Sequence, residues 1–367
     1  MKKTLLLSVF SIILLSSCGT SKKINTDNIS LKFVDDYVIP ADLEVEGTKV
    51  GGLSGIDYYN NEFYLVCDHP GNPRFYVASM EFDNKSIDTV RFEKVVKLNR
   101  NSGFLKDNTL DMEAIRFNSD SGEIWITSEG SIQNGKNPSI FSVTKEGDFV
   151  SNFDLPDYFQ VNGYQKPRNN GVFEGLSESF DHKGYWAGME LPLEKDGPKP
   201  KLYPTRSLVR ITNFNIKSKK PVTQFAMKLE SITKIPWKYF AVNGLTDLLE
   251  YAPDKFLVLE RAYSAGHGSN GNTVRIFDVD ASKASNTLLV QNIKHVNINT
   301  ATKKLAFNFD SIKDQLTENI IDNIEGMCFG PDLPNGNKTL ILISDNNFNS
   351  MGKQLSQIIM LEMNLKK

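Results

Sequence analysis

The sequence has few of the residues on which several common kinds of site depend. It contains three cysteines and four histidines among 367 residues, too few for a disulfide framework or for a zinc site built from histidine. Neither sign of charge dominates, since 42 basic and 44 acidic side chains leave a formal net charge of −2. That balance argues against a nucleic-acid-binding protein, which usually carries a basic surplus.

Several motifs of hydrolases are also absent from the sequence. It has no Gly-x-Ser-x-Gly nucleophile elbow, no GxxxxGK[ST] phosphate loop and no Arg-His-Gly-x-Arg-x-Pro. The only long apolar run is Leu5–Leu15, which is too short to span a bilayer as a stable helix. Hydrophobic residues nevertheless make up 40% of the chain, with 25 glycines, 15 prolines and 23 phenylalanines. This composition favours a soluble all-β protein with many turns.

The N-terminus has the pattern of an export signal. Lys2 and Lys3 precede the apolar run, which ends in Leu15-Ser16-Ser17-Cys18-Gly19. This ending resembles the lipobox of bacterial lipoproteins, in which the cysteine is lipidated and becomes the first residue. We therefore predict a signal peptide over 1–17, lipidation at Cys18, a flexible tether over 18–30 and one folded domain over 31–367. The alternative is an ordinary signal peptide with an incidental cysteine.

The lipid would hold the protein in the bacterial cell envelope. The residues after the predicted lipidation site, Ser21-Lys22-Lys23, lack the acidic run that some bacteria use for export to the cell surface. We therefore expect the periplasmic face of the outer membrane. The two remaining cysteines, Cys67 and Cys328, lie in apolar strand-like runs and are expected to be buried free thiols, although a disulfide between them stays open.

A repeated pattern predicts the fold. Five segments share one plan, in which a small or acidic residue begins a short apolar strand and a second strand ends in a carboxylate. The five segments are Gly52–Asp68, Met112–Glu129, Phe173–Glu190, Leu245–Glu260 and Ile324–Asp345. A third strand is expected after each of them, at 74–82, 139–144, 206–213, 273–279 and 357–363, and a fourth after the first four, at 90–98, 149–155, 222–229 and 287–293. Four antiparallel strands per repeat indicate a β-propeller.

The fifth unit lacks a fourth strand, while an unassigned strand at Leu31–Ile39 precedes the first. We predict five blades, with the N-terminal strand completing the last blade and so closing the ring. The long stretch from Asn292 to Asn323 leaves six blades as the alternative.

Acidic residues recur at the same two positions of each unit. The start of the first strand and the end of the second lie at one face of a propeller, near its central channel. The first position holds Ser54, Glu113, Glu174, Thr246 and Glu325, and the second holds Asp68, Glu129, Glu190, Glu260 and Asp345. Oxygen-only ligands favour a hard cation, so we predict that the eight carboxylates bind calcium, with magnesium as the alternative ion. A solvated acidic rim without metal is the competing interpretation.

Basic residues lie close to these acids in the sequence. Arg74, Arg168 and Arg261 are candidates to neutralise an anionic substrate, since the guanidinium group pairs bidentately with phosphate or carboxylate. Each of them alone could instead be a structural partner of a nearby acid. His267, in the glycine-rich stretch Gly266–Gly271, is expected to lie in a mobile loop that faces the substrate.

Several of these stretches together resemble the phytase-like family, described as having esterase-like activity of phytase. The resemblance rests on Arg168-x-Asn170-Gly171-x-x-Glu174-Gly175-Leu176, on Asp111–Ile115 with Trp125–Glu129, on Val258-Leu259-Glu260-Arg261 and on Asn323–Met327. It extends over roughly Leu43–Leu361. It implies a secreted propeller that hydrolyses phosphate or other esters, with the matched glutamates and arginines as site residues.

Three functions follow as hypotheses. The first is a calcium-dependent hydrolase of phosphate esters, with Glu174 central to catalysis and an anionic small molecule as substrate. The second keeps the metal but acts on lactones or carboxylic esters, and the third is a propeller that only binds a ligand or partner. We expect a monomer that contacts the membrane only through its lipid.

Overall fold

The computed structural model describes residues 29–101, 103–350 and 352–365. The predicted signal peptide, the lipidation site Cys18 and nearly all of the predicted tether lie outside these residues. Among the described residues, no helix is both long and apolar enough to cross a membrane.

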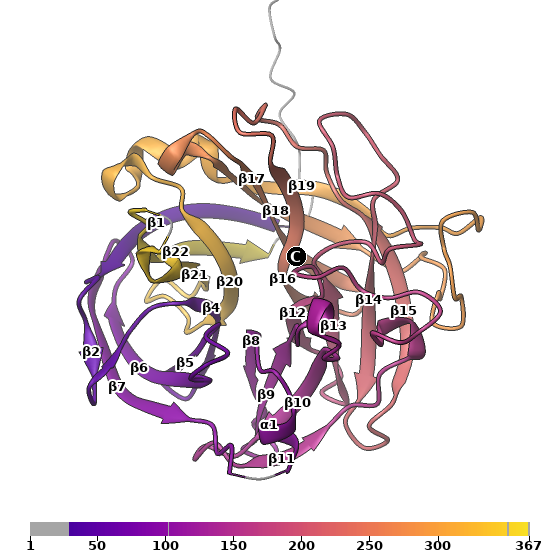
Figure 1. Cartoon of the computed structure of the whole chain (residues 1–367). Helices are drawn as coiled ribbons and strands as arrows, with labels where there is room; N and C mark the ends of the chain where they lie inside the picture. The colour runs from indigo at the N-terminus through magenta and orange to yellow at the C-terminus, as the bar shows by residue number, and fades with distance from the viewer. Residues whose placement is uncertain (1–28, 102, 351, 366–367) are drawn as a thin grey trace, which may run out of the picture.

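Five four-stranded antiparallel sheets surround a common centre, which confirms the predicted propeller (Figure 1). Blade 1 consists of β4 (Leu53–Tyr59), β5 (Glu62–Cys67), β6 (Arg74–Phe82) and β7 (Ile87–Lys97), and blade 2 of β8 (Met112–Phe117), β9 (Ile124–Ser128), β10 (Ser139–Val143) and β11 (Phe149–Asn152). Blade 3 consists of β12 (Phe173–Glu178), β13 (Gly184–Met189), β14 (Leu208–Asn215) and β15 (Pro221–Lys228). Blade 4 consists of β16 (Ala241–Ala252), β17 (Lys255–Ser264), β18 (Asn272–Asp280) and β19 (Thr302–Asn308).

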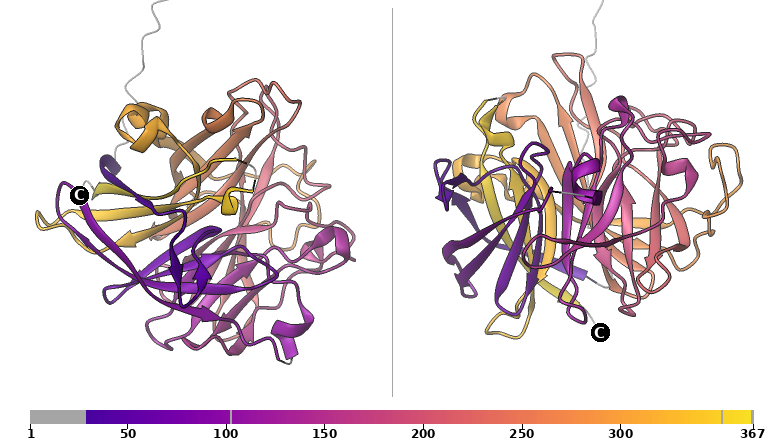
Figure 2. Two further views of the ribbon diagram at one scale, coloured as in Figure 1. Left: turned by 60° about the vertical axis from the view of Figure 1, so that its left-hand side comes forward. Right: turned by 60° about the horizontal axis from the view of Figure 1, so that its bottom comes forward.

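The fifth blade joins the two ends of the described chain. It consists of β20 (Asn323–Gly330), β21 (Lys338–Asp345), β22 (Ser356–Leu365) and, from the N-terminus, β1 (Ile29–Ile39). The pairing of β1 with β22 is antiparallel and runs from Ile29 opposite Leu365 to Ile39 opposite Ser356. This confirms the predicted ring closure, in which the N-terminal strand supplies the fourth strand of the last blade. In Figure 2, the indigo β1 lies beside the yellow C-terminal strands.

Short elements lie in the connections between strands, both within blades and between them. They are the hairpin β2 (Glu44–Val45) with β3 (Thr48–Lys49), the helix α1 (Gly103–Asp107) and 3-10 turns at Ile132–Asn134, Asp157–Phe159, Gly268–Asn270, Phe309–Gln315, Thr317–Asn319 and Asn347–Asn349. The stretch 292–323, which left a sixth blade open, contains only β19 and two of these turns before β20 begins. The described chain therefore has five blades.

The core lies between neighbouring sheets, because each blade buries apolar side chains on both of its faces. Between blades 2 and 3, Trp125 stacks on Phe153 with ring centroids 4.2 Å apart and also packs against Tyr185. Cys67 and Cys328 are both buried and free, as expected.

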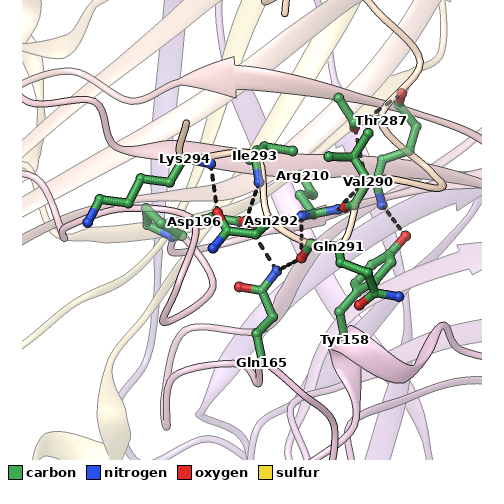
Figure 3. A network of polar contacts seen from close by, with 12 residues as sticks. Tyr158, Gln165, Asp196, Arg210, Thr287, Val290, Gln291, Asn292, Ile293 and Lys294 are labelled. Carbon is green, nitrogen blue, oxygen red and sulfur yellow. Dashed lines mark hydrogen bonds and ion pairs between the residues drawn. The ribbon is translucent and has the colours of Figure 1, made fainter. Parts of the chain in front are cut away.

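One predicted strand is wrong. Residues 287–293 do not form the fourth strand of blade 4, which is β19 at 302–308. The segment instead crosses the edge of blade 3, where the amide of Thr287 donates to the carbonyl of Gln224. Its carbonyls at Val290 and Gln291 accept hydrogen bonds from the buried Arg210 (Figure 3).

A charged network fixes that segment. Arg210 forms a two-point ion pair with Asp196, at 2.6 and 3.0 Å, and both side chains are fully buried. Asp196 also accepts from the amide of Ile293 and the side chain of Gln165 (Figure 3). These side chains form hydrogen bonds with the carbonyls of Val290 and Gln291 and with the amide of Ile293. The segment can therefore be buried without pairing to a neighbouring strand.

A second buried ion pair joins all five blades at the centre. Arg116 of β8 donates to both carboxylate oxygens of Asp247 of β16, at 3.0 and 2.9 Å. Arg116 also donates to the carbonyls of Ile56 (β4) and Met327 (β20), while Asp247 accepts from the amide of Leu176 (β12). The pair therefore connects the innermost strand of every blade and fills the middle of the channel.

Candidate metal centre

The innermost strands all carry the same irregularity near their first residue. In each of them the pairing with the second strand skips a position, which is the mark of a β-bulge. The skipped residues include Ser54, Glu113, Glu174, Thr246 and Glu325. These are the five residues of the first predicted position. A bulge leaves its residue out of the ladder and redirects the side chain, so a repeated bulge places five side chains at one level of the channel.

The second strands of blades 1, 2, 3 and 5 end at this same level. Asp68, Glu129 and Glu190 directly follow β5, β9 and β13, and Asp345 is the last residue of β21. The amides of Asp68, Glu129 and Glu190 donate to the carbonyls of Gly52, Asp111 and Val172. These bonds tie each acidic residue to the segment that leads into the first strand of its own blade.

Blade 4 departs from the predicted pattern by one residue. In the other blades, the last residue of the first strand before the bulge pairs with a residue of the second strand, and the acidic residue comes directly after that pairing residue. In blade 4 the residue before the bulge is Leu245, and Glu260 itself pairs with it. The position therefore belongs to Arg261. Because side chains alternate along a strand, the shift by one residue sends Glu260 to the other face of the sheet. There it pairs with Lys303 and accepts a hydrogen bond from Asn243 at 2.8 Å.

The structure brings seven of the predicted metal ligands together and adds one acid that was not predicted. Two overlapping groups have carboxylate oxygens within 4.8 Å of one another, Asp111 with Glu113 and Glu129, and Glu129 with Glu174 and Glu190. Asp111 lies two residues before Glu113, and that closeness was the available signal. We call Asp68, Asp111, Glu113, Glu129, Glu174, Glu190, Glu325 and Asp345 the acidic cluster.

Burial raises the pKa of every member of the acidic cluster. Desolvation is the largest cause in each, and neighbouring carboxylates of the cluster add to it in Asp68, Glu113, Glu129, Glu174 and Glu325. The pKa rises to about 9 for Asp68, about 8 for Glu129 and Glu325, about 7 for Glu190 and about 6 for Asp111 and Asp345, and well above the usual range for Glu113 and Glu174.

Arg261 is the cation placed among these acids. Its Nη2 donates to Glu325 Oε1 at 2.9 Å, and Asn323 Nδ2 donates to the same oxygen at 2.9 Å. Desolvation lowers the pKa of Arg261, but the nearby acids raise it by more, so that the net shift is upward. These acids are Glu325, Glu190, Glu174 and Asp345. The guanidinium group therefore stays charged, and one arginine faces eight carboxylates.

The donor chemistry of the acidic cluster fits a bound hard cation. Glu190 is 4% exposed, yet its Oε2 has no hydrogen-bond partner among the described residues. Glu129 Oε1 accepts from the amides of Gly171 and Val172, which orient that carboxylate. Buried oxygens without donors are the ligands that calcium takes, six to eight at a time.

The structure does not bring three other predicted site residues to the acidic cluster. Arg74 is 3% exposed and donates to the carbonyls of Asn72 and Lys49 and to the hydroxyl of Tyr76. Arg168 donates to the carbonyls of Pro192 and Gly197 and so fixes the loop after β13. Sequence proximity did not distinguish an arginine that binds backbone carbonyls from one that faces a ligand.

His267 follows the extended end of β17. Its Nε2 lies 2.8 Å from the carbonyl of Ile235, and its ring packs on Trp237 with centroids 4.7 Å apart. Trp237 is 73% exposed. Because β16 and β17 pair for several residues beyond the level of Arg261, these two rings belong to a projecting tip of blade 4.

Comparisons with known proteins identify a family for this chain. The family model described as phytase-like, esterase-like activity of phytase, matches residues 48–348. No curated protein matches the chain. Among solved structures, an endo-1,4-β-xylanase from Bacteroides thetaiotaomicron is 11% identical with a TM-score of 0.44, and the alignment covers 90% of each chain.

Two further solved structures are similar at the same level. The catalytic domain of the GH62 α-L-arabinofuranosidase of Coprinopsis cinerea is 8% identical with a TM-score of 0.45, over 92% of this chain and 98% of that one. A thermostable family-43 glycoside hydrolase is 8% identical with a TM-score of 0.47, over 87% and 94%. These likenesses carry no argument about activity, whereas the family match covers most of the sequence. The chain belongs to the phytase-like family and is a hydrolase-type β-propeller.

Proposed function

We propose that this protein is a calcium-dependent hydrolase of phosphate esters. The observation that supports this most is the acidic cluster, whose eight buried or half-buried carboxyl groups are costly to ionise together and so favour a bound cation. A phosphate group would be repelled from such a cluster unless bound cations reversed its charge. Metal dependence and an anionic substrate are therefore linked in this proposal, with magnesium as the alternative ion.

The two overlapping carboxylate groups would hold the ion. Asp111, Glu113 and Glu129 form one group, and Glu129, Glu174 and Glu190 form the other. A bound calcium ion would supply the positive charge that binds phosphate oxygens and stabilises charge developing on them. Arg261 would bind the substrate from the side of Glu325, where its guanidinium group is already oriented.

Glu325, which lies outside the two groups that would hold the ion, would handle protons. Its pKa of about 8 allows its carboxyl group to hold a proton at neutral pH. A group of this kind could pass a proton to the leaving oxygen of an ester. The buried surroundings would also exclude bulk water from the reacting group.

We further propose that a lipid on Cys18 holds the protein in the bacterial envelope, at the periplasmic face of the outer membrane. The first described residue, Ile29, pairs with Leu365 near the end of β22. β22 begins at Ser356, soon after the acidic residue Asp345, so Leu365 lies at the end of the strand that is remote from Asp345. A tether leaving from Ile29 would therefore turn the acidic cluster away from the membrane, toward diffusing substrate.

The test is phosphate release from p-nitrophenyl phosphate and from phytate, with added calcium and with chelator. We expect turnover that requires calcium and that Glu174→Gln lowers by at least about a hundredfold. The exposed loop residue Glu146 provides the matched control, since Glu146→Gln removes the same charge from outside the site. Turnover that persists in chelator would contradict the metal-dependent mechanism.

The name of the family also supports a second candidate, the hydrolysis of carboxylic esters or lactones. The same cation would then polarise a carbonyl oxygen instead of binding phosphate. Calcium-dependent activity on an aryl acetate or a lactone, with none on phosphate esters, would favour it. A protein that binds calcium and gains stability, but turns over none of these esters, would be the non-catalytic binding propeller.

A further inference from the structure

A cavity lies at the end of the channel opposite to the acidic cluster. Its volume is about 650 Å³, within the usual range for sites that bind small molecules. The innermost strands that begin at the acidic cluster end here, and they contribute Asp57, Phe117, Ser177, Glu250 and Phe329 to the lining. The Arg116–Asp247 ion pair lies between the two ends. We call this cavity the far pocket.

Aromatic side chains form much of the wall of the far pocket. They are Tyr58, Tyr59, Phe117, Phe180, Tyr251 and Phe329. Phe180 is 52% exposed and Tyr59 is 38% exposed, so a bound molecule could reach both rings. Tyr59 stacks on Phe117 with ring centroids 4.4 Å apart, so two adjacent rings form a platform.

Three carboxylates lie among these rings. Asp57 Oδ2 accepts from the amide of Phe117 at 2.7 Å. Glu250 accepts from three neutral donors, the amides of Phe180 and Asp254 and the indole of Trp186. Glu178 faces His182 at 3.2 Å and is 27% exposed.

The basic residues of the wall all have acidic partners, and one of these pairs lies within the lining, where His182 is 3.2 Å from Glu178. Arg116 is paired with Asp247, and Lys338 lies 2.7 Å from Asp332, outside the lining. The far pocket thus combines three carboxylates with the exposed rings of Tyr59 and Phe180, while Lys145 Nζ already lies 4.8 Å from the centroid of the Phe117 ring. Ring faces carry partial negative charge and attract cations, most strongly when water is excluded.

We infer that the far pocket binds a small organic cation, an ammonium group with apolar substituents. The positive charge would lie near Glu178 and Glu250, and the substituents would contact Tyr59 and Phe180. This inference does not depend on the proposed hydrolase activity, because the far pocket shares no lining residue with the acidic cluster.

The test is calorimetric titration of the purified full chain with choline and with its neutral isostere, 3,3-dimethylbutan-1-ol. Excess calcium is present throughout, so that the acidic cluster is occupied by the metal. We expect choline to bind at least about tenfold more tightly than the isostere, because the two differ in charge and not in shape. Equal binding of the two, or no binding of choline, would overturn the inference.

Variants locate the binding. Phe180→Ala and Glu178→Gln alter exposed or half-exposed side chains, so the fold should tolerate both, and each should weaken choline binding about tenfold. Glu174→Gln at the other end of the channel is the matched control and should leave choline binding unchanged. A loss in Glu174→Gln together with no change in Glu178→Gln would place the cation in the acidic cluster and refute the far pocket.

Discussion

Without metal, the stability of the protein should fall as the pH rises from 5 to 8. The acidic cluster provides the reason, since the folded state raises the pKa of its carboxyl groups. The folded protein therefore binds more protons than the unfolded chain between the two pKa values. Stability then decreases with increasing pH over that interval.

Glu190 alone sets a minimum size for the effect. Its pKa rises from 4.5 to about 7 on folding, mainly through desolvation. Each pKa unit corresponds to ~1.4 kcal/mol, so ionising Glu190 costs the folded state ~3 kcal/mol by pH 8. At about 2 °C per kcal/mol in a chain of this size, the midpoint of unfolding should drop by about 6 °C. Glu129 and Glu325 titrate at higher pH and act in the same direction.

The assay is thermal unfolding, followed by circular dichroism at pH 5, 6, 7 and 8, in chelator and in excess calcium. Calcium should remove most of the drop, because it binds the ionised carboxylates of the folded state and adds ~2.7 kcal/mol at a hundred times its Kd. Groups whose pKa folding lowers, such as Asp280 at about 2, finish titrating below this pH range and do not mask the effect.

A variant ties the pH dependence to the site. Glu190→Gln should be less sensitive to pH than the original chain in chelator, while Glu146→Gln in an exposed loop should match the original. A midpoint that stays constant or rises between pH 5 and 8 in chelator would refute the reasoning. Equal pH dependence in Glu190→Gln and the original chain would show that the effect originates elsewhere.

Three substitutions test other parts of the structure. Arg116→Met leaves Asp247 buried without a cation and should lower the free energy of unfolding by ~3–5 kcal/mol in a urea titration; a loss below 1 kcal/mol would refute the role of the central ion pair. Glu260→Gln should leave calcium affinity unchanged by calorimetry, since Glu260 faces away from the cluster, and a large loss would restore it as a ligand. Gly244→Ala would place a Cβ 2.5 Å from Glu190 Cγ and should weaken calcium binding through Glu190 with little change in stability; unchanged affinity would count against Glu190 as a ligand.

Local patterns in the sequence were sufficient to predict the five blades. Each blade has a turn between two apolar runs. Such a hairpin pairs strands that are adjacent in the sequence, so a short stretch of the chain is enough to predict it. The strands expected in each unit left one strand over at the N-terminus and one strand missing in the last blade, so the two could be matched. The pairing of β1 with β22 confirms this match. The two acidic positions followed from the same repeat, because residues at equivalent points of equivalent strands meet at one end of a ring.

Interactions between blades decided the rest of the site. The acids that meet at the cluster come from four blades, and packing of blade 2 against blade 3 brings Glu129 within reach of Glu174 and Glu190. Sequence adjacency suggested that Arg74 and Arg168 would face the same centre, yet both are bound to carbonyls of remote loops. An arginine makes the same pattern in the sequence in either role, because its partners lie far away in the chain.

The sequence by itself determined the four-stranded repeat, the closing strand and the acidic character of one end of the channel, because each is set by alternation and turns within one repeat. The structure decided between five and six blades. Only the tertiary structure decided the register of blade 4, where Arg261 takes the place expected for Glu260. It also decided that residues 287–293 lie across blade 3, held by Arg210 and Asp196. In both cases the deciding hydrogen bonds join segments that no local pattern relates, and a shift of one residue is enough to turn a side chain from one face of a sheet to the other.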